Sequence, residues 1–152
     1  MATLKSFEDI QAWQQARALS KVIFDLANNG AFSKDYSLKD QINRSSGSIM
    51  DNIAEGFERD GNKEFMLFLS YAKGSAGEVR SQLYRALDRG YISTEEHCKI
   101  SDQILTISKM LSSLITYLKQ TELKGRKYAQ EPEITYQSSA TNYETINLEP
   151  GT

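Results

Sequence analysis

Between residues 38 and 56, a ridge of hydrogen-bonding side chains runs beside an apolar stripe. The ridge residues recur every three or four positions: Gln41, Arg44, Ser48, Asn52 and Glu55. At about 100° per residue they share one arc of a helix, next to an arc of leucine and isoleucine. Such a ridge is either a patch that contacts a ligand or an internal polar network at the edge of a core. We favour the network, because a desolvated arginine without a partner costs several kcal/mol.

Partners for this network occur between residues 62 and 89, where Ser75 and Glu78 flank another apolar stripe. The planar guanidinium of Arg44 suits a carboxylate such as Glu78, because it can donate two parallel hydrogen bonds. The predicted polar network therefore comprises Gln41, Arg44, Ser48, Asn52, Glu55, Ser75 and Glu78. From it we expect Arg44→Met to destabilise the chain or its assembly more than Lys39→Met.

Other residues that could carry chemistry lack the partners that the chemistry requires. A di-iron bundle needs two histidines in paired Glu-x-x-His motifs, and this chain has one histidine, His97. Its neighbour Cys98 would point about 100° away from it on a helix, so the two do not face each other. We expect His97 to be a surface residue. The sequence also has no Gly-rich phosphate-binding loop. We therefore predict a protein that is not an enzyme and has no metal, cofactor or small-molecule substrate.

Charge and composition restrict the function further. Residues 1–120 carry 15 basic and 15 acidic side chains, and the whole chain has a formal net charge of −2. Because phosphate-backbone binding depends on lysines and arginines that release counterions, this balance weakens a nucleic-acid function without excluding it. A single cysteine makes an intrachain disulfide impossible. No apolar run is long enough to span a bilayer and no signal peptide is apparent, so we expect a cytoplasmic protein.

Four amphipathic segments position these side chains, at about residues 6–28, 37–58, 62–89 and 93–120. Ser6, Ser37 and Ser93 each stand three residues before an acidic side chain, which is typical of a helix start. Short connections between the segments predict an all-α fold, an antiparallel up-down four-helix bundle. We expect residues 1–120 to form this bundle and residues 121–152 to form a polar, largely disordered tail.

Small residues lie opposite the apolar stripes of the second and third segments. They are Gly47, Ala54 and Gly74. A glycine inside a helix costs about 1 kcal/mol relative to alanine, so its presence needs a reason. Close approach of a second subunit is one reason and chance is the other, and the sequence leaves both open.

Several motifs together resemble a bacterial family of four-helix bundles named for intervening sequences in 23S ribosomal RNA genes. The residues that carry the resemblance are Gln41-Ile42-x-Arg44, Ser48-Ile49-x-x-Asn52-Ile53-Ala54-Glu55-Gly56, Ala72-Lys73-Gly74-Ser75 with Glu78, Phe7-x-Asp9-Ile10-x-Ala12-Trp13-x-x-Ala16, Tyr36-x-Leu38 and Gly90-Tyr91. The resemblance covers about residues 7–118. This chain departs from the family at Ser33, where the family usually has Pro, at Asp35, where it has Glu, and at Ser45 and Ser46, where it has Ala.

The resemblance implies a bundle that commonly assembles into a homopentamer and has no catalytic activity. It also implies a relation to the accessory protein of diversity-generating retroelements, which binds nucleic acid through a strongly basic surface. Our main hypothesis is therefore a non-enzymatic homo-oligomer that binds RNA, DNA or a nucleic-acid-processing partner. The candidate phosphate contacts, which do not share one helix face, are Lys63, Lys73, Arg80, Arg85 and Arg89. The alternative, favoured by the neutral body, is a protein-interaction scaffold with no nucleic-acid role.

Overall fold

The computed structural model describes residues 4–122, and the regular structure of this part of the chain is all helical. Two short 3₁₀ helices, η1 (Phe7–Asp9) and η2 (Gly30–Lys34), accompany the α-helices. The α-helices are α1 (Gln11–Ala27), α2 (Tyr36–Glu58), α3 (Asn62–Asp88) and α4 (Thr94–Glu122). The described residues contain no strand, which confirms the all-α prediction. The predicted tail lies outside them, except that Thr121 and Glu122 complete α4.

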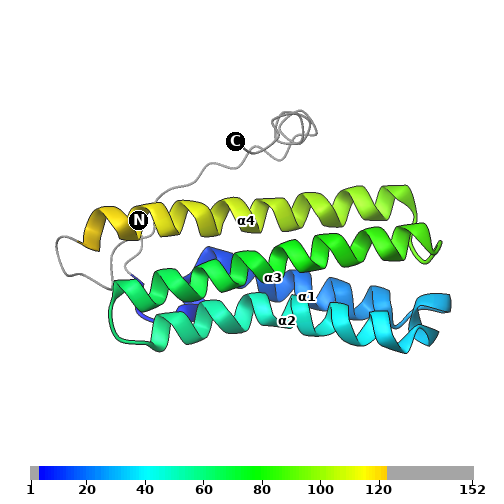
Figure 1. Ribbon diagram of the computed structural model, residues 1–152, viewed down its shortest axis with the longest axis horizontal. Helices are drawn as coiled ribbons and strands as arrows, with labels where there is room; N and C mark the ends of the chain where they lie inside the picture. The colour runs from blue at the N-terminus through cyan, green and yellow to red at the C-terminus, as the bar shows by residue number, and fades with distance from the viewer. Residues whose placement is uncertain (1–3, 123–152) are drawn as a thin grey trace.

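The α-helices lie side by side, and each runs antiparallel to the next one in the chain, as Figure 1 shows. The most extensive contact joins α2 to α3, and each helix also packs against its neighbour in the chain. The contact between α1 and α4 that closes the bundle is smaller than the others. This arrangement is the predicted antiparallel up-down bundle, with its weakest side between the first and last helices.

The core consists of the apolar stripes of the helices. In α3 and α4 the stripe positions step by three and four residues, and all are buried: Phe65, Leu69, Ala72, Ala76, Val79, Leu83 and Ala86, and Ile100, Ile104, Ile107, Leu111, Leu114 and Leu118. Small side chains on α3 and larger ones on α4 let the two surfaces interdigitate at close packing. Within residues 4–122, no helix has the long apolar stretch needed to cross a bilayer.

Two of the three predicted helix starts carry the expected side-chain hydrogen bonds. The Asp9 carboxylate accepts a hydrogen bond from the Ser6 backbone N–H at 3.2 Å, although the turn that it closes is η1. At the start of α4, Ser93 Oγ accepts from the Glu96 N–H at 3.1 Å, and the Glu96 carboxylate accepts from the Ser93 N–H at 3.0 Å. This reciprocal pair satisfies two donors that the helix itself leaves without partners.

The predicted cap of α2 is wrong by two residues. Asp35, not Ser37, precedes the helix, and its carboxylate accepts a hydrogen bond from the Leu38 N–H at 3.2 Å. Residues before it form η2, where a loop was expected. Aspartate and serine are both good N-caps, so the choice between them depends on how η2 directs the chain into the helix. The consequence is that the Asp35 side chain faces the end of α3.

Gly56 marks a close approach of α2 to α3. A Cβ atom at this position would lie 2.5 Å from Phe68 Cβ and 3.3 Å from both the ring and the carbonyl oxygen of Phe65. The lack of a side chain therefore allows the two helices to pack together. By contrast, a Cβ atom added at Gly47 or Gly74 would meet no other atom within 4 Å. The structural reason for Gly56 is internal, whereas residues 4–122 supply no such reason for Gly47 or Gly74.

Candidate functional site: the polar seam between α2 and α3

Polar side chains line the contact between α2 and α3. We define the polar seam as Asp35, Gln41, Ser45, Ser48 and Asn52 on the α2 side, and Ser75, Gln82, Arg85, Arg89 and Tyr91 on the α3 side. Partners of successive α2 residues occur at progressively earlier positions along α3. This is the register of two antiparallel helices, and it continues to the close approach at Gly56.

The middle of the polar seam is nearly closed to solvent. The Ser45 hydroxyl donates a hydrogen bond to Gln82 Oε1, and both residues are buried. Further along, Ser75 Oγ lies 3.1 Å from Ser48 Oγ, which also accepts a hydrogen bond from Asn52 Nδ2 at 2.9 Å. Buried polar groups with satisfied hydrogen bonds hold two surfaces in one register, because any shift leaves donors and acceptors unpaired.

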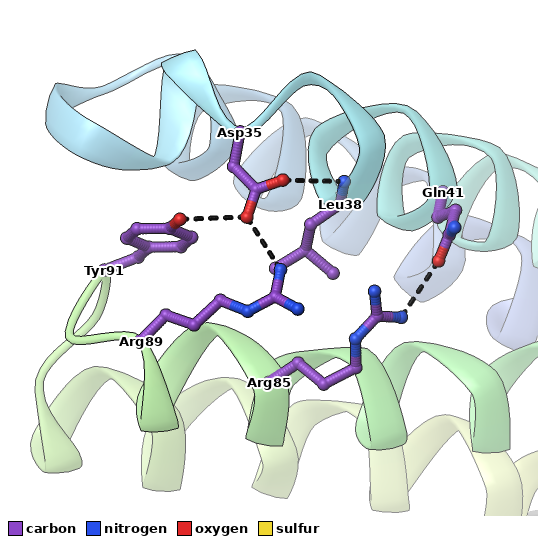
Figure 2. Close-up of polar contacts among 6 residues, drawn as sticks. All are labelled: Asp35, Leu38, Gln41, Arg85, Arg89 and Tyr91. Atoms are coloured by element: carbon purple, nitrogen blue, oxygen red, sulfur yellow. Dashed lines mark hydrogen bonds and ion pairs between the residues drawn. The ribbon is translucent and has the colours of Figure 1, made fainter.

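Asp35 joins three elements at the end of the polar seam, as Figure 2 shows. Its Oδ2 accepts hydrogen bonds from Arg89 Nη1 at 2.7 Å and from the Tyr91 hydroxyl at 2.9 Å, while Oδ1 accepts from the Leu38 N–H. One carboxylate therefore caps α2, forms an ion pair with α3 and holds the chain that leaves α3. Its side chain is 17% exposed, so water competes little for these hydrogen bonds.

These contacts change the pKa of the Asp35 carboxyl group and of the Tyr91 hydroxyl group. Hydrogen bonds from Tyr91 first and the Leu38 N–H second, with a smaller effect of Arg89, hold the pKa of Asp35 below its usual value. The same carboxylate raises the pKa of Tyr91, because it accepts the tyrosine proton in a hydrogen bond and repels a phenolate. Asp35 therefore stays ionised and Tyr91 stays protonated across the neutral range, as a structural contact requires.

The predicted polar network is present in part. Ser48, Asn52 and Ser75 are joined as expected, and each is half-buried. Gln41 lies beside them on α2, but its amide oxygen accepts from Arg85 Nη1 at 2.9 Å. Figure 2 shows the Gln41–Arg85 pair beside the Asp35 contacts, between the same two helices. The sequence thus identified the correct helix faces but not all of the partners.

The predicted pairing of Arg44 with Glu78 is wrong. Arg44 Nε lies 3.1 Å from Asp40 Oδ2 on its own helix, and the two side chains are 81% and 62% exposed. Glu78 is exposed on α3. Glu55 is likewise directed along α2, where it forms an ion pair with Arg59 at 2.8 Å. In the single chain these charged residues lie at the solvent side of the ridge, where ion pairs contribute little to stability.

The candidate phosphate contacts divide into three groups. Arg85 and Arg89 already bind Gln41 and Asp35 in the polar seam. Arg80 is half-buried, and its Nε is shielded from solvent and has no hydrogen-bond partner within residues 4–122. Lys63 and Lys73 are exposed, so of the five candidates these two remain best placed to meet an external phosphate.

His97 is buried between α3 and α4, which contradicts the expectation of a surface residue. It is 5% exposed, and its ring centroid lies 4.5 Å from that of Tyr84 on α3. Its Nε2 has no hydrogen-bond partner among the described residues. The first turn of a helix is often exposed, but here the turn directs this side chain against α3.

The described residues also form a groove, and they hold no metal site. Between the end of α1 and the start of α4 lies a groove of about 350 Å³, lined by Val22, Asp25, Leu26, Asn29, Glu96, Lys99, Ile100 and Gln103. Nowhere in residues 4–122 do three histidine, cysteine or carboxylate side chains gather where a metal ion could bind. The groove mixes apolar walls with side chains of both charges, and lacks an arrangement that points to one reaction.

The comparison with known proteins agrees with the fold. Residues 8–113 match the family model of the 23S rRNA-intervening sequence protein. The chain belongs to this family. A crystal structure of a protein of unknown function from the S23 ribosomal protein family of Bacteroides thetaiotaomicron is also similar. It has 25% sequence identity and a TM-score of 0.63, and the similarity covers 68% of this chain and 97% of that one. No curated protein matches the chain.

The family motifs in this chain map largely onto the polar seam. Gln41, Ser48, Asn52 and Ser75 belong both to the motifs and to the hydrogen-bonded contacts between α2 and α3. Gly56, which follows Glu55 in the same motif, lies where the two helices approach closely. A structural role therefore explains much of the signature without any ligand. Asp35 and Tyr91 were not predicted to belong to the polar network, although Tyr91 lies in the Gly90-Tyr91 motif and Asp35 stands where the family usually has Glu.

Proposed function

We propose that this protein is a non-enzymatic, cytoplasmic homo-oligomer, with a pentamer as the expected assembly, that binds RNA or a partner that processes nucleic acid. The observation that supports assembly is the set of mid-helix glycines that face outward. Gly47, Gly74 and Gly77 each have no atom within 4 Å of an added Cβ position. Each costs about 1 kcal/mol relative to alanine, a cost that contact with another subunit would explain.

Apolar side chains near these glycines support the same proposal. Leu67 and Tyr71 on α3 are 48% and 50% exposed, and both lie within two turns of Gly74. Tyr71 also packs edge-on against Phe68, with ring centroids 5.4 Å apart. Apolar groups clustered on one helix next to small residues give a surface that a second chain can approach closely.

Light scattering on the purified full chain tests the assembly. We expect the wild type to have a mass several times that of one chain, and Gly74→Leu to dissociate it while the helical content stays unchanged. Leucine fits at this position in the single chain, because nothing lies near the glycine. Ala18→Leu adds comparable bulk on an exposed face of α1 and is the matched control. A monomeric wild type would refute the assembly.

The nucleic-acid part of the proposal depends on the family and on the two exposed lysines of α3. The family name associates these proteins with ribosomal RNA genes, and an oligomer would repeat Lys63 and Lys73 around its surface. We expect the Lys63→Ala, Lys73→Ala double variant to bind structured RNA more weakly, with a smaller dependence on salt. The Lys39→Ala, Lys99→Ala variant removes the same charge elsewhere. No binding of wild type at low salt would refute this part.

A protein-interaction scaffold is the second candidate function. The balanced charge of residues 1–120 favours it, as does the use of Arg85 and Arg89 in internal contacts. Copurification from the native host distinguishes the two: RNA in the eluate supports the first, and one protein partner at fixed stoichiometry supports the second.

A further inference from the structure

The N-terminal end of α4 is attached to the bundle through a buried histidine. His97 is 5% exposed and its ring lies against Tyr84, which is itself 49% exposed. Its Nε2 is shielded from solvent and makes no hydrogen bond within the described residues. A neutral imidazole can occupy such a place at modest cost, but an imidazolium there would be a charge without a compensating acceptor.

The charged groups around His97 increase this cost. Burial is the main reason why the pKa of His97 lies below its usual value of 6.5, and the Arg80 guanidinium is the second. The Asp88 carboxylate acts in the opposite direction and is the smaller influence. On α4 itself, the Glu96 carboxylate is engaged by the Ser93 N–H at the helix cap. A proton on His97 would thus meet a nearby cation and only partial compensation.

The other side of the same helical turn is poorly supported. Glu96, Lys99 and Ile100 line the groove of about 350 Å³ that separates α4 from α1, with Asp25 on the opposite wall. The α1–α4 contact is also smaller than those between helices adjacent in the chain. This end of α4 therefore depends on α3 for its attachment, and His97 lies within that attachment.

We propose that His97 is a pH-sensitive latch, whose protonation releases the N-terminal end of α4 from α3 while α1, α2 and α3 stay packed together. In the released state the imidazolium is hydrated and separated from Arg80. Release would also widen the groove between α1 and α4 and expose Ile100. The latch is independent of any nucleic-acid binding.

The chain permits a direct test because His97 is its single histidine. In the full-length wild type, the pH dependence of the imidazole Cε1 proton resonance reports this one group. We expect a midpoint below 6.5, which Arg80→Gln raises and Asp88→Asn lowers. A wild-type midpoint at or above 6.5 would refute the latch, and this titration does not depend on any variant.

Hydrogen exchange then locates the opening. On acidification from about pH 7 to about pH 5, we expect amide protection factors in residues 97–104 to fall by up to about tenfold per pH unit, as one linked proton allows. Protection in α2 should stay unchanged. His97→Gln cannot be protonated, and His97→Phe keeps a ring against Tyr84, so both should abolish the pH dependence. Equal losses of protection in wild type and either variant would overturn the proposal, as would loss spread evenly over all four helices.

Discussion

Gly56→Ala should destabilise the bundle although alanine is the better helix former. The added Cβ atom would lie 2.5 Å from Phe68 Cβ, which is attached to the backbone and cannot move away by a change of rotamer. The two helices must therefore separate, and overpacking of this kind costs about 1–3 kcal/mol. Alanine recovers up to about 1 kcal/mol of helix propensity. We expect a net loss of about 1–2 kcal/mol, equivalent to a melting temperature lower by about 3–6 °C in a chain of this size.

Urea unfolding of Gly56→Ala measures this loss, and Gly47→Ala is the matched control on the same helix. The control adds the same methyl group where no atom lies within 4 Å, so it should be neutral or stabilising by up to about 1 kcal/mol. The comparison requires light scattering to show the same assembly state for wild type and both variants. If Gly56→Ala is as stable as wild type with an unchanged urea dependence, the close approach of α2 to α3 does not constrain the fold.

Three further predictions follow from the polar seam and its surroundings. The pKa of Asp35 is lowered on folding, so its contribution to the free energy of unfolding should be complete above about pH 4 and lost as the pH falls below 3.8. In acid unfolding, Asp35→Asn should lack this loss of stability. Arg44→Met and Lys39→Met should now have equal melting temperatures within about 2 °C, because Arg44 is 81% exposed; a larger loss at Arg44 would show a partner in the assembly. In urea unfolding, Ser45→Ala and Gln82→Ala should each lower the free energy of unfolding by about 1–3 kcal/mol, and the double variant should lose less than the sum. Additive losses would refute their buried hydrogen bond.

The fold could be predicted because local patterns specify it. The stripes of α3 and α4 repeat every three or four residues without interruption, and all of their positions are buried. The capping box of Ser93 and Glu96 also depends on residues three positions apart, which lie in one turn in any helix of this sequence. The same spacing failed at Ser37, because η2 leads the chain into α2 at Asp35, so a local pattern holds only where the neighbouring element leaves it unchanged.

Two other errors concern contacts between helices. Arg44 lies on the correct arc of α2, but small rotations of the helix decide whether a long side chain meets Glu78 or Asp40, and here it meets Asp40. His97 lies in a first turn where exposure is common, yet the approach of α3 buries it against Tyr84. Periodicity gives the direction of a side chain relative to its own helix. It does not give the distance to the next helix, and that distance decides burial and partner.

The polar seam changes what a nucleic-acid-binding surface on this protein could be. Arg85 and Arg89 supply two of the five candidate charges, and both donate to oxygen atoms of the α2 side. Each guanidinium has further N–H donors, so a phosphate could bind beside these contacts, but it would compete with the α2-side oxygen atoms for the same positive charge. Lys63 and Lys73 lie outside the polar seam, but two lysines per chain release few counterions. Strong binding to RNA therefore requires the assembly to place lysines from several chains along one nucleic acid, and a variant that stays monomeric should lose that binding even with every lysine intact.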